Sequence, residues 1–344
     1  MKRVVCYRVY RKVQIKKYKN SKSNMKVHYL VSQNDNNSSP LLFSTVANEW
    51  LCSETQQLKE STIATYTHKL NKYIIPYFGE NGITNINTQE IYHFINDALS
   101  NNLSRKYVSY LYRIIRAIYH FAEKKYGIKD ITTDISIRAK EYHSIDILNV
   151  RQQEELIKYF TTHQTPTTLA VALSYYAGLR IGEICALRWD DIDLNERMIY
   201  VNKTIQRIQC KGEYQKTKII ITSPKSDSST REIPIPPCLY NMILTFPKEQ
   251  NQYIISQSAE PIEPRTLQYR FSRLLESAGL DHIRFHSLRH MFASNALALG
   301  FDVKALSEIL GHSSANITLK TYVHSSTQVK RTYMDMIGND IFVE

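Results

Sequence analysis

The sequence predicts a mainly α-helical protein with a small β-sheet, divided between two domains. Its 344 residues suit two domains at roughly 100–200 residues each, and 43% of them are apolar, which is enough to fill ordinary cores. Apolar residues recur at helical spacing through the first half of the chain, behind residues that can cap helices. Short β-like runs between positions 198 and 235 interrupt the helical pattern in the second half. These observations predict a helical domain followed by an α+β domain.

Residues 1–40 form a basic segment in front of the first predicted helix. Positions 1–34 hold ten Lys or Arg and no Asp or Glu. Apolar residues alternate between positions 4 and 13, which suggests a strand or an irregular arm, and the polar positions 32–40 indicate a linker. We expect this segment to be an arm or a basic tail that adds non-specific affinity for a polyanion.

Residues 41–140 predict a compact bundle of about four helices. Four candidate N-caps precede apolar residues at helical spacing: Ser44, Ser61, Asn87 and Ser104. Asn87 and Glu90 also have the spacing of a capping box. The helix that starts at Ser104 is long and is expected to end near Gly127, since glycine favours a helix C-terminus.

The long helix also carries basic residues between its apolar positions: Arg105, Lys106, Arg113 and Arg116. These side chains could face DNA, and we mark them as candidate DNA-binding residues. The commoner reading of such charges is a solvated helix face.

Residues 149–344 predict the second, α+β domain, which follows a linker at 141–148. Asn149 can cap its first helix, and a second helix is expected through positions 169–176. Short strands are expected around 198–201, 218–222 and 231–235, and helices to the end of the chain. The turn-rich polar stretch between the last two strands predicts a hairpin.

The charge balance indicates a polyanionic partner. Lys and Arg number 44 against 32 Asp and Glu, which gives a formal net charge of +12. Releasing counterions from phosphates favours binding of such a protein, although charge alone leaves nucleic acid at about even odds. Five cysteines with no metal-ligand spacing suggest reduced thiols, and no apolar run predicts a membrane span. We expect a cytoplasmic protein with no cofactor and no metal.

Arg180 and Glu183 form the first cluster of interest. Gly178 permits a tight turn, after which Arg180 sits near a helix start, where backbone N–H groups favour an anion. Glu183 lies one turn on and can hold the guanidinium in place. The structural alternative is a buried Arg–Glu pair that ties the helix to its neighbours.

Two further clusters carry cations. Lys225 lies at the shoulder of the predicted hairpin, from which it could reach a DNA groove, although most lysines are simply on the surface. His286 and Arg289 are three residues apart, so a helix places them on one face. There, an imidazole can move a proton while a guanidinium clamps phosphate oxygens. The structural alternative is an exposed polar helix start.

The last cluster places a tyrosine behind a histidine. Gly311 is expected to end one helix, His312 to lie in the turn, and Tyr322 to fall in the next helix. A lone tyrosine means little among 24, so its position after the other clusters gives it weight.

The ordered set of Arg, Lys, His-x-x-Arg, Gly-His and Tyr resembles the tyrosine recombinase (phage integrase) family, which includes integrases of phages and conjugative elements. The resemblance covers about positions 41–330 and is strongest in 177–192, 285–290 and 310–322. It implies a helical core-binding domain at 41–140 and a catalytic domain with a C-terminal tail at 149–344. The two would clamp DNA from opposite sides.

The resemblance also implies a role for each residue of the set. The catalytic cations would be Arg180, Lys225, His286, Arg289 and His312, with Tyr322 as the nucleophile and Glu183 as a support for the first arginine. Preorganised arginines suit the charge that builds on phosphoryl oxygens, and a 3′-phosphotyrosyl link would conserve the bond energy.

The implied partners are double-stranded DNA at recombination sites and, in the synapse, three further copies of the chain in a homotetramer. An excisionase or another accessory DNA-bending protein is a candidate partner. The sequence does not specify the DNA site, or choose between integration, excision, inversion and dimer resolution. It also leaves open whether the C-terminal tail docks on its own domain or on a neighbour.

Two other functions compete with recombination. A type IB topoisomerase-like enzyme would use similar chemistry to relax supercoils, but the helical domain and the tail favour a recombinase. A catalytically inert DNA-binding protein of the same fold would have no need of Lys225 or Tyr322.

Overall fold

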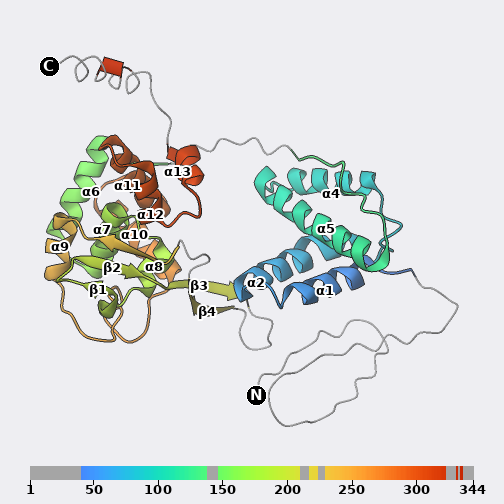
Figure 1. Ribbon diagram of the computed structural model, residues 1–344, viewed down its shortest axis with the longest axis horizontal. Helices are drawn as coiled ribbons and strands as arrows, with labels where there is room; N and C mark the ends of the chain where they lie inside the picture. Colours follow the sequence, from blue (N-terminus) through green and yellow to red (C-terminus); the bar gives the residue numbers. More distant parts are fainter. Residues whose placement is uncertain are drawn as a thin grey trace, which may run out of the picture. The chain divides into compact units, whose positions relative to one another are not determined.

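The computed structural model describes residues 40–137, 146–209, 217–223 and 229–322, together with Arg331, Met334 and Asp335. These residues belong to two compact units. The first comes from the N-terminal part of the chain and the second from the rest, except that positions 208–218 group with the first. Figure 1 shows the elements of both units. Apart from Pro40, the predicted segment 1–40 lies outside the described residues.

The first unit is a helical bundle. Phe43, Ile74, Ile91, Leu111 and Ile118 form part of its core and are fully buried. A π-helical turn at Leu70–Ile74 joins its second and third helices. The α-helices are α1 (Phe43–Glu54), α2 (Glu60–Lys69), α3 (Ile75–Phe78), α4 (Thr88–Ser100) and α5 (Arg105–Tyr126).

Local signals determine the ends of α4 and α5. Glu90 donates its N–H to the Asn87 side chain over 3.0 Å, and Asn87 donates its N–H to the Glu90 carboxylate over 2.8 Å. Ser104 accepts the N–H of Tyr107, and Gly127 ends α5 in the left-handed conformation at φ 67°. The predicted caps and stop of these helices are therefore confirmed.

The predicted caps of the first two helices are wrong. Helix α1 begins after Leu42 and α2 after Lys59, and neither of these side chains caps its helix. Leu42 forms an isolated β-bridge with Gly82, and Phe43 is buried behind it. This tertiary contact starts α1 before Ser44, and Ser61 likewise lies inside α2.

The second unit packs helices around α7, which is apolar on nearly every side, as befits a central helix. Asn149 caps the first helix of this unit in a capping box, which confirms that prediction. The α-helices are α6 (Val150–Thr162), α7 (Pro166–Ala177), α8 (Ile181–Ala186), α9 (Pro237–Leu244), α10 (Pro264–Ser277), α11 (His286–Ala298), α12 (Val303–Leu310) and α13 (Ala315–Tyr322).

Two small antiparallel sheets accompany these helices. One has the order β1-β2-β5, and its register places Arg231 opposite Val201 and Ile233 opposite Ile199. The other is the pair β3-β4. A 3-10 turn at Trp189–Asp191 precedes the first sheet. The strands are β1 (Ile192–Asp193), β2 (Met198–Val201), β3 (Thr204–Gln209), β4 (Thr217–Thr222) and β5 (Arg231–Pro234).

The predicted hairpin between the runs at 218–222 and 231–235 is wrong. Strand β4 pairs with β3, whereas β5 crosses to pair with β2 in the other sheet. The local pattern located both strands, but the partner of β5 is decided by burial of its alternate residues, Arg231 and Ile233, against the core. A turn-rich connection does not reveal such a pairing.

Candidate active site

The start of α8 holds the first arginine. Helix α7 ends at Gly178 in the left-handed conformation, at φ 64°, and Arg180 is the N-cap residue of α8. The Glu183 carboxylate, 4% exposed, accepts the backbone N–H of Arg180 over 2.9 Å and its Nη1–H over 2.7 Å. Glu183 therefore fixes both the backbone and the guanidinium of Arg180.

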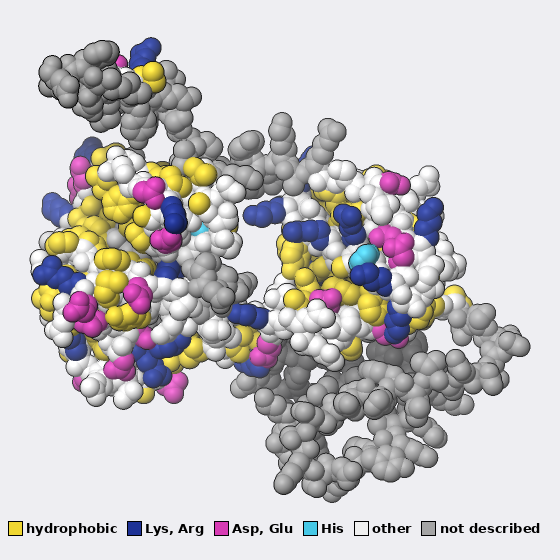
Figure 2. Space-filling view, viewed as in Figure 1, with side chains coloured by type: hydrophobic (Ala, Val, Ile, Leu, Met, Phe, Trp, Pro, Cys, Tyr) yellow, Lys and Arg dark blue, Asp and Glu magenta, His cyan; other side chains and the backbone are white. Residues whose placement is uncertain are grey.

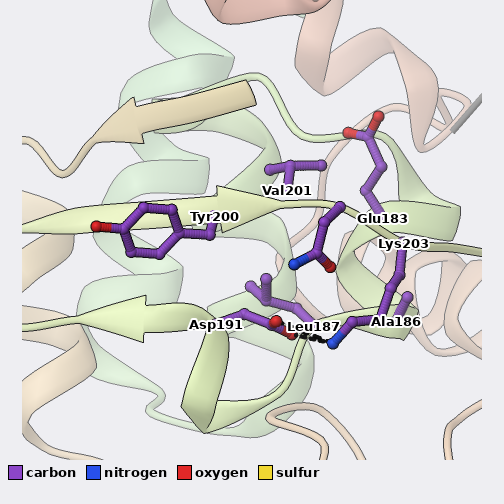
Figure 3. Close-up of a pocket in the computed structure, with 8 residues that line it drawn as sticks. Glu183, Ala186, Leu187, Asp191, Tyr200, Val201 and Lys203 are labelled. Atoms are coloured by element: carbon purple, nitrogen blue, oxygen red, sulfur yellow. Dashed lines mark hydrogen bonds and ion pairs between the residues drawn. The ribbon is translucent and has the colours of Figure 1, made fainter. Parts of the chain in front are cut away.

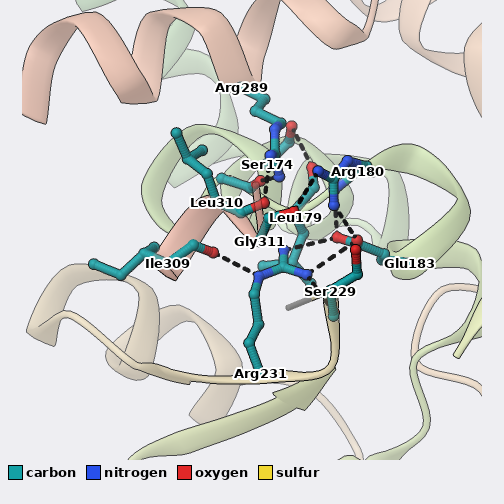
Figure 4. A network of polar contacts seen from close by, with 11 residues as sticks. Ser174, Leu179, Arg180, Glu183, Ser229, Arg231, Arg289, Ile309, Leu310 and Gly311 are labelled. Carbon is teal, nitrogen blue, oxygen red and sulfur yellow. Dashed lines mark hydrogen bonds and ion pairs between the residues drawn. The ribbon is translucent and has the colours of Figure 1, made fainter. Parts of the chain in front are cut away.

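A second arginine approaches the same place from α11. Arg289 is only 2% exposed. Its Nη1 donates to the Gly178 carbonyl over 2.6 Å, and its Nη2 donates to the Leu310 carbonyl. Arg180 Nη2 donates to the next carbonyl, that of Gly311, over 3.0 Å. Arg180 and Arg289, 109 positions apart in the sequence, thus converge on the turn after α12, as Figure 4 shows.

A third arginine, which we did not single out from the sequence, joins this network. Arg231 on β5 is 9% exposed. Its Nη1 and Nη2 donate to the two oxygens of Glu183 over 3.0 and 2.8 Å, and its Nε donates to the Ile309 carbonyl over 2.6 Å. A signal was present: in a period-two strand, Arg231 shares the inward face with Ile233.

The charges of this network are unbalanced. Burial raises the pKa of Glu183, but hydrogen bonds and charge from Arg231, and charge from Arg180, outweigh it and lower the pKa to about 2. Glu183 therefore stays ionised near neutral pH. The network holds three guanidinium groups, of which Arg180 and Arg231 pair with this one carboxylate, so it has an excess of positive charge that would favour a bound anion.

Two histidines border the arginines. His312 follows Gly311, is half-buried, and its Nδ1 lies 2.8 Å from the Thr318 hydroxyl. His286 begins α11 at an exposed position, with its ring centroid 4.7 Å from that of His290. Desolvation by the surrounding protein, followed by nearby cations that include Arg289, lowers the pKa of each ring to about 4. Both rings are neutral at pH 7.

The structure therefore brings Arg180, Glu183, Arg289 and His312 together at one turn. The charges of Arg180 and Arg289 also lower the pKa of His286. The positions of the other two predicted side chains, those of Lys225 and Tyr322, are not described. Lys225 lies outside the described residues, and Tyr322 is described only as the last residue of α13, without its side chain.

A small pocket with essentially no room for a water molecule adjoins Glu183 on another side. Lys203 donates to the two oxygens of Asp191 over 2.9 and 3.0 Å along its wall. Figure 3 shows that the Glu183 carboxylate points away from this ion pair. The pocket therefore shares Glu183 with the arginine network, but the carboxylate of Glu183 faces the arginines.

The four candidate DNA-binding residues lie on α5 of the first unit, and all are exposed: Arg105, Lys106, Arg113 and Arg116. At 3.6 residues per turn they fall within an arc of about 100°. The buried residues Val108, Leu111 and Ile115 lie on the other side of the helix. In Figure 2, Lys and Arg side chains, coloured dark blue, are scattered over the visible face of this unit.

Within the described ranges, one group has spacing suited to a metal ion. It consists of His120, Glu123 and Asp130, whose ligand atoms lie within 4.8 Å of one another. His120 and Glu123 are exposed, and Asp130 already accepts two hydrogen bonds from Thr132. The group belongs to the first unit and shares no residue with the arginine network.

Family models match a part of each unit. The model of the phage integrase family matches residues 146–329, and that of the phage integrase N-terminal SAM-like domain matches residues 42–99. The chain belongs to the phage integrase family. The resemblance to tyrosine recombinases is thereby confirmed, and members of this family cleave and rejoin DNA.

Individual relatives agree with this assignment. Tyrosine recombinase XerC of Bacillus pumilus is 24% identical over 296 residues, which cover 79% of this chain and 89% of the relative. A tyrosine recombinase XerC-like protein of Caldanaerobacter subterraneus is 28% identical over 190 residues, 50% of this chain; the match spans 48% of that relative, about half its length.

Solved structures confirm the predicted fold class. The Tn1549 transposon integrase in complex with a circular intermediate DNA has a TM-score of 0.72 at 20% identity, covering 86% of this chain and 99% of that chain. A lambda integrase tetramer bound to a Holliday junction has a TM-score of 0.61 at 17% identity, covering 83% and 78%. Among the described residues of this integrase, no helix is both long and apolar enough to cross a membrane.

Proposed function

We propose that this integrase is a site-specific DNA recombinase whose active site is the arginine network and whose nucleophile is Tyr322. The observation that carries the proposal is the convergence of Arg180 and Arg289 on the turn at 310–311, next to His312. Membership of the phage integrase family supports it.

The arginines would stabilise the charge that develops on a phosphodiester under attack. Both stay charged at any working pH, and each can bind two oxygens. Because Glu183 and backbone carbonyls already hold them, little reorganisation is needed when the phosphate arrives. His312, neutral and hydrogen-bonded to Thr318 through Nδ1, could donate from its other nitrogen in the appropriate tautomer.

The remaining roles concern protons. Tyr322 is a weak nucleophile until its phenol, with an ordinary pKa of about 10, loses a proton. His286 is neutral at pH 7 and can accept that proton, and Lys225 can protonate the departing 5′ oxygen. The resulting 3′-phosphotyrosyl link conserves the bond energy, so a 5′ hydroxyl of another strand can reverse the step without ATP.

DNA binding and assembly complete the proposal. The helical region 41–140 would bind DNA through the basic face of α5, and the catalytic region 149–344, with its C-terminal tail, would hold the scissile phosphate. Solved relatives are complexes with DNA, one of them a tetramer on a Holliday junction. A homotetramer in the synapse, an accessory DNA-bending protein, a role for residues 1–40 in DNA affinity, and action in the cytoplasm remain predictions.

Neither competing function gains support. Both the helical and the catalytic region match integrase models, and none of the relatives described is a topoisomerase. An inert binding protein would have no need of a buried network with excess positive charge behind one turn.

Substitution of the nucleophile tests the proposal. Nicked duplexes are first selected from a random-sequence library by covalent capture on the wild-type protein, since the DNA site is unknown. Tyr322→Phe should bind the selected duplex with unchanged Kd and form no covalent adduct, measured on denaturing gels. Failure of the wild type to capture any DNA, or adducts with Tyr322→Phe, would refute the proposed function or its nucleophile.

A further inference from the structure

We propose that Arg231 is a positioning residue of this active site. It holds Glu183 and the end of α12 in place, so that the charge of Arg180 stays available to the phosphate. The inference rests on the proposed function, because it concerns how the same arginines meet DNA. Nε, Nη1 and Nη2 of Arg231 already donate to Ile309, Ser229 and both oxygens of Glu183, so we assign it a supporting role and no contact with the substrate.

The contacts of Arg231 join three separate segments. From β5 it reaches Glu183 on α8 with two parallel N–H···O bonds of 2.8 and 3.0 Å. Its Nε donates to the carbonyl of Ile309 on α12, and its Nη1 also donates to the Ser229 carbonyl. Figure 4 shows the guanidinium between the Glu183 carboxylate and the Ile309 carbonyl. A planar, five-donor fork can make this set of bonds, whereas a lysine cannot.

The turn after α12 is built against this side chain. Gly311 has φ 61°, and a Cβ on it would lie 3.0 Å from Cδ and 3.1 Å from Nη1 of Arg231. The Gly311 carbonyl is in turn an acceptor of Arg180. A shift of Arg231 would therefore move an acceptor of Arg180 as well as its carboxylate partner.

The positive charge of Arg231 also offsets the negative charge of Glu183. If Glu183 paired with Arg180 alone, its negative charge would cancel the charge that should attract phosphate. The bidentate pair with Arg231 satisfies Glu183 from the other side. Glu183 can then orient Arg180 through one Nη1–H bond while the site keeps its excess positive charge.

The alternative is an ordinary buried ion pair that only stabilises the fold. A pH profile separates the two, because a positioning role makes the ionised state of Glu183 matter for cleavage. The charged groups around Glu183 are Arg180 and Arg231, the titratable ring of His286 also interacts with it, and the Lys203–Asp191 pair lies beside the adjoining pocket. Arg231 makes the largest contribution that lowers the pKa of Glu183 against the effect of burial, so loss of Arg231 raises this pKa.

The experiment compares single-turnover adduct formation by the full chain from pH 5 to 8, on the captured nicked duplex at saturating concentration. Variants are Arg231→Lys, Arg231→Met, Glu183→Gln and the double variant Arg231→Met/Glu183→Gln. We expect both Arg231 variants to bind DNA with Kd within a few-fold of wild type and to cleave about 10–100-fold more slowly at pH 8. In Arg231→Met the acid limb of the profile should also move to higher pH, and the double variant should not show this movement.

The matched control is Arg197→Met. Arg197 is an exposed arginine of the same unit, and its guanidinium stacks on Tyr240. This variant should cleave DNA at the wild-type rate. Circular dichroism melting identifies folded variants, and Arg231→Lys, which keeps the charge, decides the question if Arg231→Met does not fold. Wild-type cleavage by a folded Arg231 variant overturns the inference. So does a slow variant with an unmoved acid limb, or a movement that persists without the Glu183 carboxylate. Each of these leaves the proposed function intact, which fails only if the wild type forms no adduct.

Discussion

Arg289 shows how much of the site depends on the geometry of single side chains. Both Nη atoms of this buried group have backbone acceptors, Gly178 and Leu310, at the ends of α7 and α12. These two helix ends have left-handed glycines, Gly178 and Gly311, and a Cβ on Gly178 would lie 2.6 Å from the Phe292 ring. The arginine thus ties together the ends of α7 and α12, which border the proposed phosphate site.

Arg289→Lys keeps the charge but loses the fork. One ammonium group cannot reach both carbonyls and a phosphate, so we expect cleavage to fall by about 10–100-fold, the value of one or two charged hydrogen bonds. DNA affinity should change little, since most of it comes from phosphate contacts elsewhere. Adduct formation on the captured nicked duplex measures the first quantity and a filter-binding titration the second. Near-normal cleavage by this variant would contradict the clamp role.

At this scale the sequence singled out cations that lie in specific local patterns, and Arg231 lies in none of them. Arg180 with Glu183, and His286 with Arg289, are each three residues apart, so helix geometry alone brings them into consideration. Arg231 is recognised only when β5 is known to face the core beside β2, a pairing between distant segments. The relation between Tyr322 and the arginines likewise depends on tertiary structure that no spacing encodes.

Among the elements, those with complete local signals were predicted best. The capping boxes at Asn87 and Asn149 and the glycine stop at Gly127 are short-range hydrogen-bond and backbone effects, and the structure has all of them. The start of α1 depends instead on a bridge between Leu42 and Gly82, 40 positions apart. Non-local contacts of this kind override weak local preferences.

Helix α5 is the element of the first unit that we expect to bind DNA. Its exposed basic arc lies opposite its buried face, which leaves these side chains accessible to phosphates. We expect Arg113→Gln/Arg116→Gln to weaken binding and to make the slope of log K against log salt shallower by about 2, at roughly 0.9 for each phosphate that is no longer neutralised. Fluorescence anisotropy titrations from about 50 to 200 mM salt measure this slope.

The control for α5 removes the same charge elsewhere in the unit. Lys125→Gln/Lys129→Gln also removes two exposed cations, Lys125 at about 100° from the edge of the basic arc on α5 and Lys129 beyond the end of the helix. Its salt slope should match wild type. Equal losses in both double variants would mean that α5 contributes only general charge, and the assignment of a DNA-binding face would be withdrawn.

The whole molecule consists of two units with separate cores. Each unit has its own large cluster of buried apolar residues, and a different family model matches a part of each. From the sequence we expected two domains because of a change in periodicity and a linker at 141–148, since a domain needs its own apolar interior. The grouping of positions 208–218 with the first unit could not be predicted, since a two-stranded extension has no local signature of its partner.

Division into fragments tests what the two units contribute together. Fragments 1–142 and 143–344 should each melt cooperatively, as expected for units with their own cores, although loss of positions 208–218 should lower the Tm of the first. Each should bind the captured duplex far more weakly than the full chain, because joining two binding modules raises affinity by about 10²–10⁴ through effective concentration. The catalytic fragment should still form adducts when its concentration is raised to compensate. If that fragment binds as tightly as the whole protein, the helical unit adds nothing to DNA affinity, and two units acting on one duplex would be the wrong description of this integrase.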